Sequence, residues 1–234
     1  MATIAANIQQ VQDRIAASCQ EAGRAVESVT LLAVSKTFPA PAVREAVACG
    51  LHRFGENYVQ EALDKMEALA DLRDRLEWHL IGPLQSNKTR VVAEHFDWVH
   101  SVDRLKIAER LSAQRPSHLP PLQICLQVNI SGEASKSGLN PDEVAATAQA
   151  VAALPGLRLR GLMAIPEPAE TLPAQRQPHA ALRRLLEQLR AQGLALDTLS
   201  MGMTADLEAA VLEGATIVRV GTAIFGSRPP VPRG

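Results

Sequence analysis

Aromatic residues are scarce in this chain: phenylalanine, tryptophan and tyrosine together make up 3% of its 234 residues. Leucine, valine, isoleucine and alanine must therefore fill the core, and an apolar content of 47% is enough for a sizeable one. A chain of this length suits one large α/β domain or two small ones.

Several signals that mark particular classes of protein are also missing. The formal net charge is −1, so the chain carries no electrostatic footprint for nucleic acid or for an anionic membrane. The six histidines show no metal-ligand spacing, so we expect no metal site. The N-terminus lacks a basic segment followed by an apolar one, and no apolar run approaches the length of a membrane span.

Cysteine usage points to a reducing compartment. Cys19, Cys49 and Cys125 are an odd number, lie far apart and form no C-x-x-C motif. We expect reduced, mostly buried thiols and a cytoplasmic protein. No long exposed apolar stripe is apparent, which favours a monomer.

The hydrophobic pattern predicts eight strands that alternate with helices. A helix over 3–23, with Gly23 where a C-terminal cap would lie, precedes the first strand. The expected strands are 30–36, 51–55, 77–81, 98–102, 123–130, 157–165, 198–201 and 216–220. Eight strands that alternate with helices over this length predict a single α/β domain over 1–234, a (β/α)8 TIM barrel with an extra N-terminal helix. A doubly wound sheet is the alternative, although no G-x-G-x-x-G follows the first strand.

Three local expectations accompany this pattern. Asp103 should cap the helix after the fourth strand, and Asn140 with Pro141 should begin the helix after the fifth. Residues 166–178, rich in proline and glutamate, should form a surface loop. The proline-containing linker at 115–121 is too short and too central to divide the chain into domains.

The first strand ends in a lysine. Alternation places Lys36 on the same face as Leu32 and Val34, and a buried ammonium there is costly unless it is paired, partly solvated or neutral. A lysine in a semi-apolar mouth has a depressed pKa and becomes the nucleophilic amine that Schiff-base chemistry needs. A strand-end lysine that reaches out to water is the simpler alternative, and Lys36 by itself does not decide between them.

The turns after the last two strands have the composition of a phosphate pocket. In a TIM barrel these two loops commonly bind phosphate, and small residues let the backbone approach an anion. Ser200 and Gly202 lie in one turn, and Gly221 and Thr222 lie in the other. Either turn alone is ordinary, but both together favour phosphate.

Arg219 is a second unusual residue within a strand. It shares a face with Ile217 and Gly221, and an inward arginine needs an acceptor. No obvious acid ends a neighbouring strand, so a bound acceptor is the alternative to a structural salt bridge. A Schiff-base lysine, a phosphate pocket and this arginine together suggest pyridoxal 5′-phosphate (PLP).

Seven ordered motifs make this suggestion specific. The chain resembles the YggS/PROSC family of PLP-binding homeostasis proteins, whose fold is a single barrel similar to the N-terminal domain of bacterial alanine racemases. The matching segments are LAVSKT at 32–37, FGENYVQE at 54–61, WHLIGPLQSNK at 78–88, VNI with KSG within 128–138, GLM at 161–163, SMGM at 200–203 and VRVGTAIFG at 218–226.

The resemblance implies that Lys36 holds PLP as a Schiff base. The other cofactor-binding residues that it implies are Asn57, Ser200, Met201, Arg219, Gly221 and Thr222. In this assignment Ser200, Gly221 and Thr222 hold the phosphate, Arg219 faces the pyridine nitrogen, and Asn57 and Met201 lie beside the cofactor.

Arg219 would also limit turnover. Arginine can only donate, so the pyridine nitrogen would stay unprotonated and the ring would be a poorer electron sink. Racemases with an arginine here add a catalytic tyrosine from a second domain, whereas this chain's only tyrosine is Tyr58 and the chain ends at Gly234. We therefore expect a protein that binds, buffers and delivers PLP, with apo PLP-dependent enzymes as possible recipients and little or no catalysis.

Two rival functions remain open. A true amino-acid racemase would exchange the Cα proton, and a cofactor-free Schiff-base aldolase would bind a sugar phosphate in the same pocket. Among lesser features, Lys136, Lys88 and Arg90 could each contact an anion but are expected to be solvated, and His79 is expected to be a satisfied barrel residue rather than a base.

Overall fold

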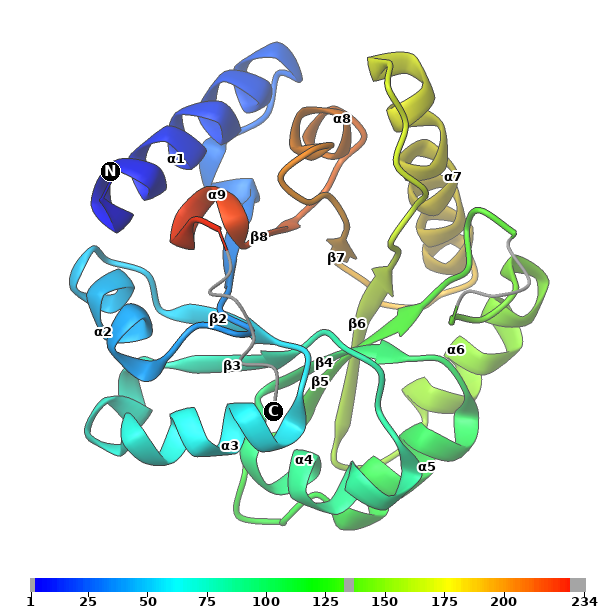
Figure 1. The fold of residues 1–234 in the computed structure, drawn as a ribbon. Coiled ribbons are helices and arrows are strands. Elements are labelled where there is room, and N and C mark those ends of the chain that lie inside the picture. The colour runs from blue at the N-terminus through cyan, green and yellow to red at the C-terminus, as the bar shows by residue number, and fades with distance from the viewer. Residues whose placement is uncertain (1–2, 133–136, 228–234) are drawn as a thin grey trace.

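Eight parallel strands close into a barrel in the computed structural model, which describes residues 3–132 and 137–227 (Figure 1). Each strand pairs with the next along the chain, and β1 pairs with β8 to complete the closure. The strands are β1 (Thr30–Val34), β2 (Arg53–Glu56), β3 (Glu77–Leu80), β4 (Trp98–Val102), β5 (Leu122–Gln127), β6 (Leu157–Met163), β7 (Thr198–Ser200) and β8 (Ile217–Val220). The predicted TIM barrel is confirmed, and the doubly wound sheet is excluded.

Helices surround the barrel and cover its outer face (Figure 1). The α-helices are α1 (Ile4–Glu21), α2 (Ala40–Ala48), α3 (Val59–Ala68), α4 (Thr89–His95), α5 (Leu105–Gln114), α6 (Val144–Ala152), α7 (Leu172–Ala191), α8 (Leu207–Leu212) and α9 (Thr222–Phe225). Short 3-10 turns are η1 (Val26–Ser28), η2 (Ala70–Arg75), η3 (Ser86–Lys88) and η4 (Pro141–Glu143). The extra helix α1 packs against α8 and α9. Gly23, just beyond its end, has φ 64°, as expected for a capping glycine.

Apolar side chains form two separate layers of core. The larger layer lies between the strands and the helices, and Trp78, Phe54 and Phe96 are its largest fully buried members. A smaller cluster fills the barrel interior, as alternation along each strand requires. Its members are Leu32, Val34, Ile81, Trp98, Cys125, Met163 and Ile217.

The ends of some predicted strands are wrong by one to three residues. β1 stops at Val34 instead of continuing to Lys36, because the backbone turns there and Thr37 adopts φ 67°. β5 ends at Gln127 and β6 at Met163. After β5 and β6 the apolar pattern continues, with Val128 and Ile130 and with Ala164 and Ile165, past the point at which ladder pairing ends.

Two of the helix-start predictions are also wrong. Asp103 does not cap α5: the preceding residue is Arg104, whose guanidinium pairs with the Asp103 carboxylate at 2.8 Å. The loop expected over 166–178 ends early, because the Thr171 hydroxyl accepts a hydrogen bond from the amide of Ala174 and starts α7. The expected start at Asn140 is confirmed, since its side chain forms a capping box with Glu143.

No helix within residues 3–132 and 137–227 combines the length and the apolar character that a membrane crossing requires.

Candidate functional site

The predicted site residues lie at the carboxyl ends of four strands that are neighbours in the barrel, in the order β7, β8, β1 and β2. Lys36 follows β1 and Asn57 follows β2, whereas Ser200 ends β7 and Arg219 lies within β8. In the β1–β8 ladder Leu32 pairs with Arg219, so the lysine and arginine strands are in direct contact. The fold brings these distant segments to one end of the barrel.

Lys36 lies two residues beyond the last residue of β1. Leu32 and Val34 belong to the apolar cluster inside the barrel, and the chain turns soon after Val34, so Lys36 lies in the turn at the carboxyl end of β1. The residue is half-buried, between the packed interior and solvent. An amine in this position is partly desolvated yet reachable from the open end, which suits a nucleophile.

A strained residue directly follows Lys36 in the turn after β1. Thr37 is the only non-glycine residue with positive φ among the described residues, and for a β-branched residue this conformation is a true outlier. Its amide donates a hydrogen bond to Oε1 of Glu61 at 2.5 Å, which holds the turn from α3. The strain is therefore maintained by a contact that crosses from the strand end to a helix.

A buried ion cluster supports the same turn from below. The Lys65 ammonium donates to the Ser35 carbonyl at 2.6 Å and lies 2.7 Å from carboxylate oxygens of both Glu56 and Glu61. The Ser35 hydroxyl donates to Glu56, which is fully buried. Burial raises the pKa of Glu56, and the charge of Lys65 opposes that rise. Ser35, the residue before Lys36, is thus held through both its carbonyl and its hydroxyl.

Arg219 is almost completely buried, with 3% of its surface exposed. Its Nη1 donates to the Ser200 hydroxyl at 2.8 Å, and its Nη2 donates to the Ala164 carbonyl at 2.9 Å. Burial lowers the pKa of Arg219 to about 10, against the raising effect of Asp206, so the guanidinium stays charged at neutral pH. In the described part of the chain no carboxylate lies within ion-pair distance of it. The predicted alternative of a structural salt bridge therefore finds no support here.

The Ser200 hydroxyl faces the barrel interior, where it also lies 2.7 Å from Nδ1 of His100. Ser200 and His100 are both fully buried. The implied contact between this hydroxyl and a phosphate stays a prediction, while the partners that the structure gives it are Arg219 and His100.

Asn57 leaves a polar atom without a partner at the mouth. Its Oδ1 is buried, and no hydrogen-bond partner is present for it within the described residues. The loop after β3 packs closely here, because a Cβ on Gly82 would lie 2.4 Å from the Asn57 carbonyl oxygen. A buried polar atom without a partner costs free energy in the native state. Such an unsatisfied acceptor, at the end of the strand that pairs with β1, is a position that a ligand donor can satisfy.

The turns after β7 and β8 are tightly built. Gly202 has φ 95°, and a Cβ there would lie 2.5 Å from the Cβ of Ala210. A Cβ on Gly221 would approach the Val34 carbonyl to 3.1 Å, which ties the end of β8 to the end of β1. Thr222 is exposed at the start of α9, and Met201 is fully buried. The two turns thus border the mouth in which Lys36 lies.

Comparison with known proteins gives consistent results. The family model for the alanine racemase N-terminal domain matches residues 2–229. A protein of Pseudomonas aeruginosa named pyridoxal phosphate homeostasis protein is 65% identical over 228 residues, which is 97% of each chain. The chain belongs to the family of pyridoxal phosphate homeostasis proteins.

Two further relatives agree with this assignment. The pyridoxal phosphate homeostasis protein of Escherichia coli K12 is 53% identical over 229 residues, covering 97% of this chain and 98% of its own. The solved structure of PipY from Synechococcus elongatus, determined with PLP bound, is 42% identical. It superposes with a TM-score of 0.81 and covers 92% of this chain and 100% of its own.

The residues present fit the cofactor of this family by their chemistry. Lys36 provides an amine for an aldehyde, Arg219 is a donor suited to a ring nitrogen, and Asn57 has an unsatisfied polar atom. The two tight turns at Gly202 and Gly221 bring backbone near the same mouth. No group in this set conflicts with PLP.

Some functional neighbours could not be found from the sequence. His100 and the Glu56–Lys65 cluster were not anticipated, because each depends on side chains that meet across the barrel or beneath a turn. Lys136 lies outside the described residues. Lys88 and Arg90 are exposed, as expected for solvated side chains.

Proposed function

We propose that this protein binds PLP as a Schiff base on Lys36 and acts in intracellular PLP homeostasis, by buffering and delivery, with little or no catalysis. The observation that carries the proposal is the meeting of a half-buried lysine and an almost completely buried inward arginine at one end of the barrel. The names of its close relatives and the PLP-bound PipY structure support the same function.

Bound PLP supplies an aldehyde that a lysine amine can attack and a pyridine ring that can act as an electron sink. In the chain itself, the Glu61 contact to Thr37 and the Lys65 contact to Ser35 hold the residues on both sides of Lys36. Arg219 donates its protons and cannot accept one, so it leaves a ring nitrogen unprotonated. This arrangement favours retention of the cofactor over chemistry on an amino acid.

A racemase needs an acid or base on the face opposite the lysine. The one tyrosine in the sequence, Tyr58, lies at the start of α3 and is 57% exposed. Exposure of this size gives its hydroxyl no packed surroundings that would hold it against a substrate. We therefore rank the carrier function above the racemase.

We also propose a cytoplasmic monomer that passes PLP to apo enzymes. The three cysteines are free thiols, which fits a reducing compartment. Tyr58, Ile165 and Met203 are exposed apolar side chains on loops at the carboxyl end of the barrel, where a recipient would have to approach.

The test is an absorption titration with PLP on the wild type, on Lys36→Ala and on the control Lys106→Ala, which alters an exposed lysine of α5. The proposal predicts a near-visible band in the wild type and the control, and none in Lys36→Ala. A wild type that takes up no PLP would refute the proposal and favour the aldolase. Catalytic exchange of the Cα proton of an added amino acid by the PLP-loaded protein would instead favour the racemase.

A further inference from the structure

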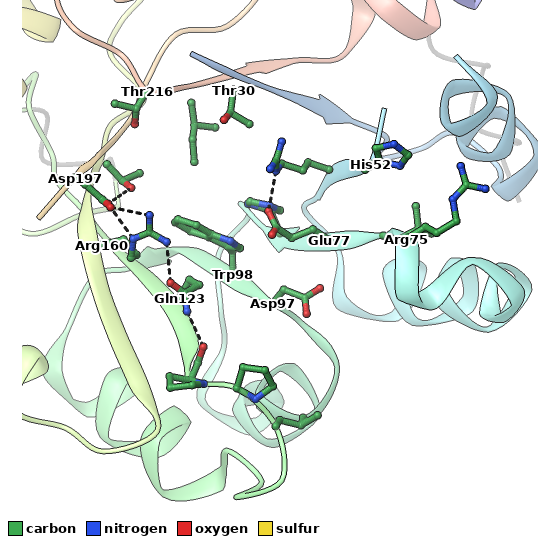
Figure 2. A pocket seen from close by; sticks show the side chains of 18 of the residues that line it. Thr30, His52, Arg75, Glu77, Asp97, Trp98, Gln123, Arg160, Asp197 and Thr216 are labelled. Carbon is green, nitrogen blue, oxygen red and sulfur yellow. Dashed lines mark hydrogen bonds and ion pairs between the residues drawn. The ribbon is translucent and has the colours of Figure 1, made fainter. Parts of the chain in front are cut away.

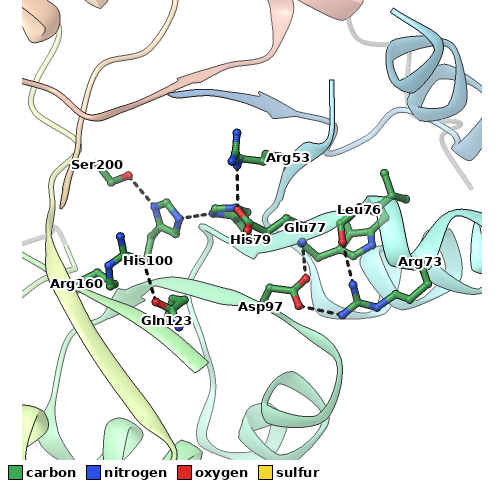
Figure 3. A network of polar contacts seen from close by, with 11 residues as sticks. Arg53, Arg73, Leu76, Glu77, His79, Asp97, His100, Gln123, Arg160 and Ser200 are labelled. Carbon is green, nitrogen blue, oxygen red and sulfur yellow. Dashed lines mark hydrogen bonds and ion pairs between the residues drawn. The ribbon is translucent and has the colours of Figure 1, made fainter. Parts of the chain in front are cut away.

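A continuous line of polar side chains crosses the barrel interior, and Figure 3 shows its part from Glu77 to Ser200. Nε2 of His79 lies 2.8 Å from Oε1 of Glu77, and Nδ1 of His79 lies 2.8 Å from Nε2 of His100. Nδ1 of His100 lies 2.7 Å from the Ser200 hydroxyl, which accepts from Nη1 of Arg219 at 2.8 Å. We call Glu77, His79, His100, Ser200 and Arg219 the trans-barrel chain. It comes from four strands, β3, β4, β7 and β8.

The two ends of the trans-barrel chain lie in different surroundings. His79, His100 and Ser200 are fully buried and Arg219 nearly so, whereas 38% of the Glu77 side chain is exposed. The Arg219 end belongs to the candidate PLP site. The middle of the trans-barrel chain is therefore shielded from water, and only its Glu77 end is in contact with solvent.

The Glu77 end opens into a cavity of about 1040 Å³ at the amino-terminal end of the strands (Figure 2). Arg53 pairs with Glu77 at 3.2 Å in this cavity. Trp98 also lines it, and the His79 ring stacks on the indole with ring centroids 5.2 Å apart. Stacking fixes the plane of the His79 ring, so that one ring nitrogen faces Glu77 and the other faces His100.

Only one arrangement of protons satisfies every member of the trans-barrel chain when Glu77 is ionised and both histidines are neutral. The carboxylate can only accept, so His79 must carry its proton on Nε2 and accept at Nδ1. His100 must then donate from Nε2 and accept at Nδ1, which leaves the Ser200 hydroxyl as the donor to His100. That hydroxyl in turn accepts from Arg219. The reverse direction would require a protonated Glu77 and would leave the Ser200 proton without this acceptor.

The protonation states that this arrangement needs agree with the surroundings. Burial lowers the pKa of His79, and burial with the neighbouring His79 and Arg219 lowers the pKa of His100 well below its usual value. Burial alone would raise the pKa of Glu77, but its hydrogen bond with His79 and the charge of Arg53 bring that pKa below its usual value. At neutral pH the carboxylate is charged and both imidazoles are neutral.

We infer that Glu77, His79, His100 and Ser200 are positioning residues that fix Arg219 through a one-directional hydrogen-bond chain, and so link the cavity at the opposite face to the PLP site. Arg219 donates one proton into this chain, so the direction of the chain determines the orientation of its guanidinium. A one-directional chain of buried hydrogen bonds polarises each member in the same sense. The inference rests on the proposed function for its effect on PLP, but not for the tautomers that it assigns.

The first experiment therefore needs no cofactor. Ring nitrogen shifts of 15N-histidine-labelled protein, prepared without added PLP, report which nitrogen carries the proton. His79 and His100, assigned with the variants His79→Gln and His100→Gln, should both be neutral and protonated on Nε2 at neutral pH. A proton on Nδ1 of either histidine, or an imidazolium, would overturn the inference.

The second experiment asks whether the far end of the chain influences the PLP site. Glu77→Leu removes the terminal acceptor, Glu77→Gln keeps an acceptor without the charge, and Asp97→Asn makes the same carboxylate-to-amide change in the same cavity. Asp97 bonds to Arg73 and to the Trp78 amide and is not part of the chain. Ser200→Ala breaks the chain next to Arg219.

We expect Ser200→Ala to weaken PLP binding about tenfold or more, because it removes one buried, charge-assisted hydrogen bond to Arg219 together with the phosphate contact predicted for this hydroxyl. Glu77→Leu should shift the absorption band of bound PLP and weaken binding about threefold, because its effect passes through four hydrogen bonds. Glu77→Gln should restore most of the wild-type behaviour, and Asp97→Asn should match the wild type.

Glu77→Leu and Asp97→Asn with equal effects would overturn the inference, because a general disturbance of the cavity would then explain both. Failure of Glu77→Gln to recover the band would contradict it as well. If the wild type takes up no PLP, the proposed function fails. The histidine tautomers from the first experiment then still test whether the trans-barrel chain has the assigned direction.

Discussion

Replacement of Lys65 by methionine should destabilise the protein far more than an ordinary lysine substitution. Lys65 is buried, and its ammonium is shared by the Ser35 carbonyl, Glu56 and Glu61. Lys65→Met keeps most of the side-chain volume but leaves the fully buried carboxylate of Glu56 without its cation. Breaking one side of a buried ion pair costs roughly 3–5 kcal/mol. Glu56 keeps its hydrogen bond from the Ser35 hydroxyl, so we expect a loss near the lower limit.

The double variant Lys65→Met/Glu56→Gln separates the charge from the packing. It removes both charges together, and such replacements are often close to neutral. We expect it to recover most of the stability lost in Lys65→Met. The measurement is urea unfolding followed by circular dichroism, with Lys106→Met as the exposed control, which should stay within about 0.5 kcal/mol of the wild type.

A double variant as unstable as Lys65→Met would refute this reasoning, since the loss would then come from packing and not from an unpaired Glu56 carboxylate. A Lys65→Met variant that matches the Lys106→Met control would refute it as well, because the cluster would then contribute nothing to the turn at Thr37.

Two further predictions concern acid and the β7 turn. The folded-state pKa values of His79 and His100 are lowered, so below a pH of about 6.5 the unfolded chain binds more protons than the folded one. The free energy of unfolding should therefore be complete above this pH and fall below it, by up to about 1.4 kcal/mol per pH unit for each histidine. Urea unfolding at several pH values measures this slope, and constant stability from pH 7 to 5 would contradict it. Gly202→Ala should cost about 2 kcal/mol or more, because φ is 95° and the new Cβ would lie 2.5 Å from that of Ala210. The double variant Gly202→Ala/Ala210→Gly removes the clash but keeps the positive φ, so it should recover only part of the lost stability. Full recovery in thermal unfolding would show that φ imposes no strain.

The order of elements could be predicted from the sequence because each strand carries its own apolar run. Eight such runs, separated by helical periodicity, leave few alternatives to a barrel. Strand ends could not be placed as well, since they depend on long-range contacts. The end of β1 is the clearest example: Thr37 turns the chain because Glu61, on a later helix, accepts a hydrogen bond from its amide.

The candidate site divides in the same way. Lys36 and Arg219 could be singled out because charged residues in apolar strands are unusual, and the turns at Gly202 and Gly221 could be singled out by composition. His100 gave no such signal: it lies in an ordinary strand, and its partner Ser200 is 100 residues away. Its role depends on which side chains meet inside the closed barrel, which no local pattern encodes.

The central claim is that Lys36, and no other lysine, holds PLP. The sequence contains five lysines, so borohydride reduction of PLP-loaded protein followed by peptide mass mapping distinguishes among them. We predict a pyridoxyl label on Lys36 at near-stoichiometric yield and only traces elsewhere. A label spread over the other lysines, or concentrated on one of them, would contradict the account.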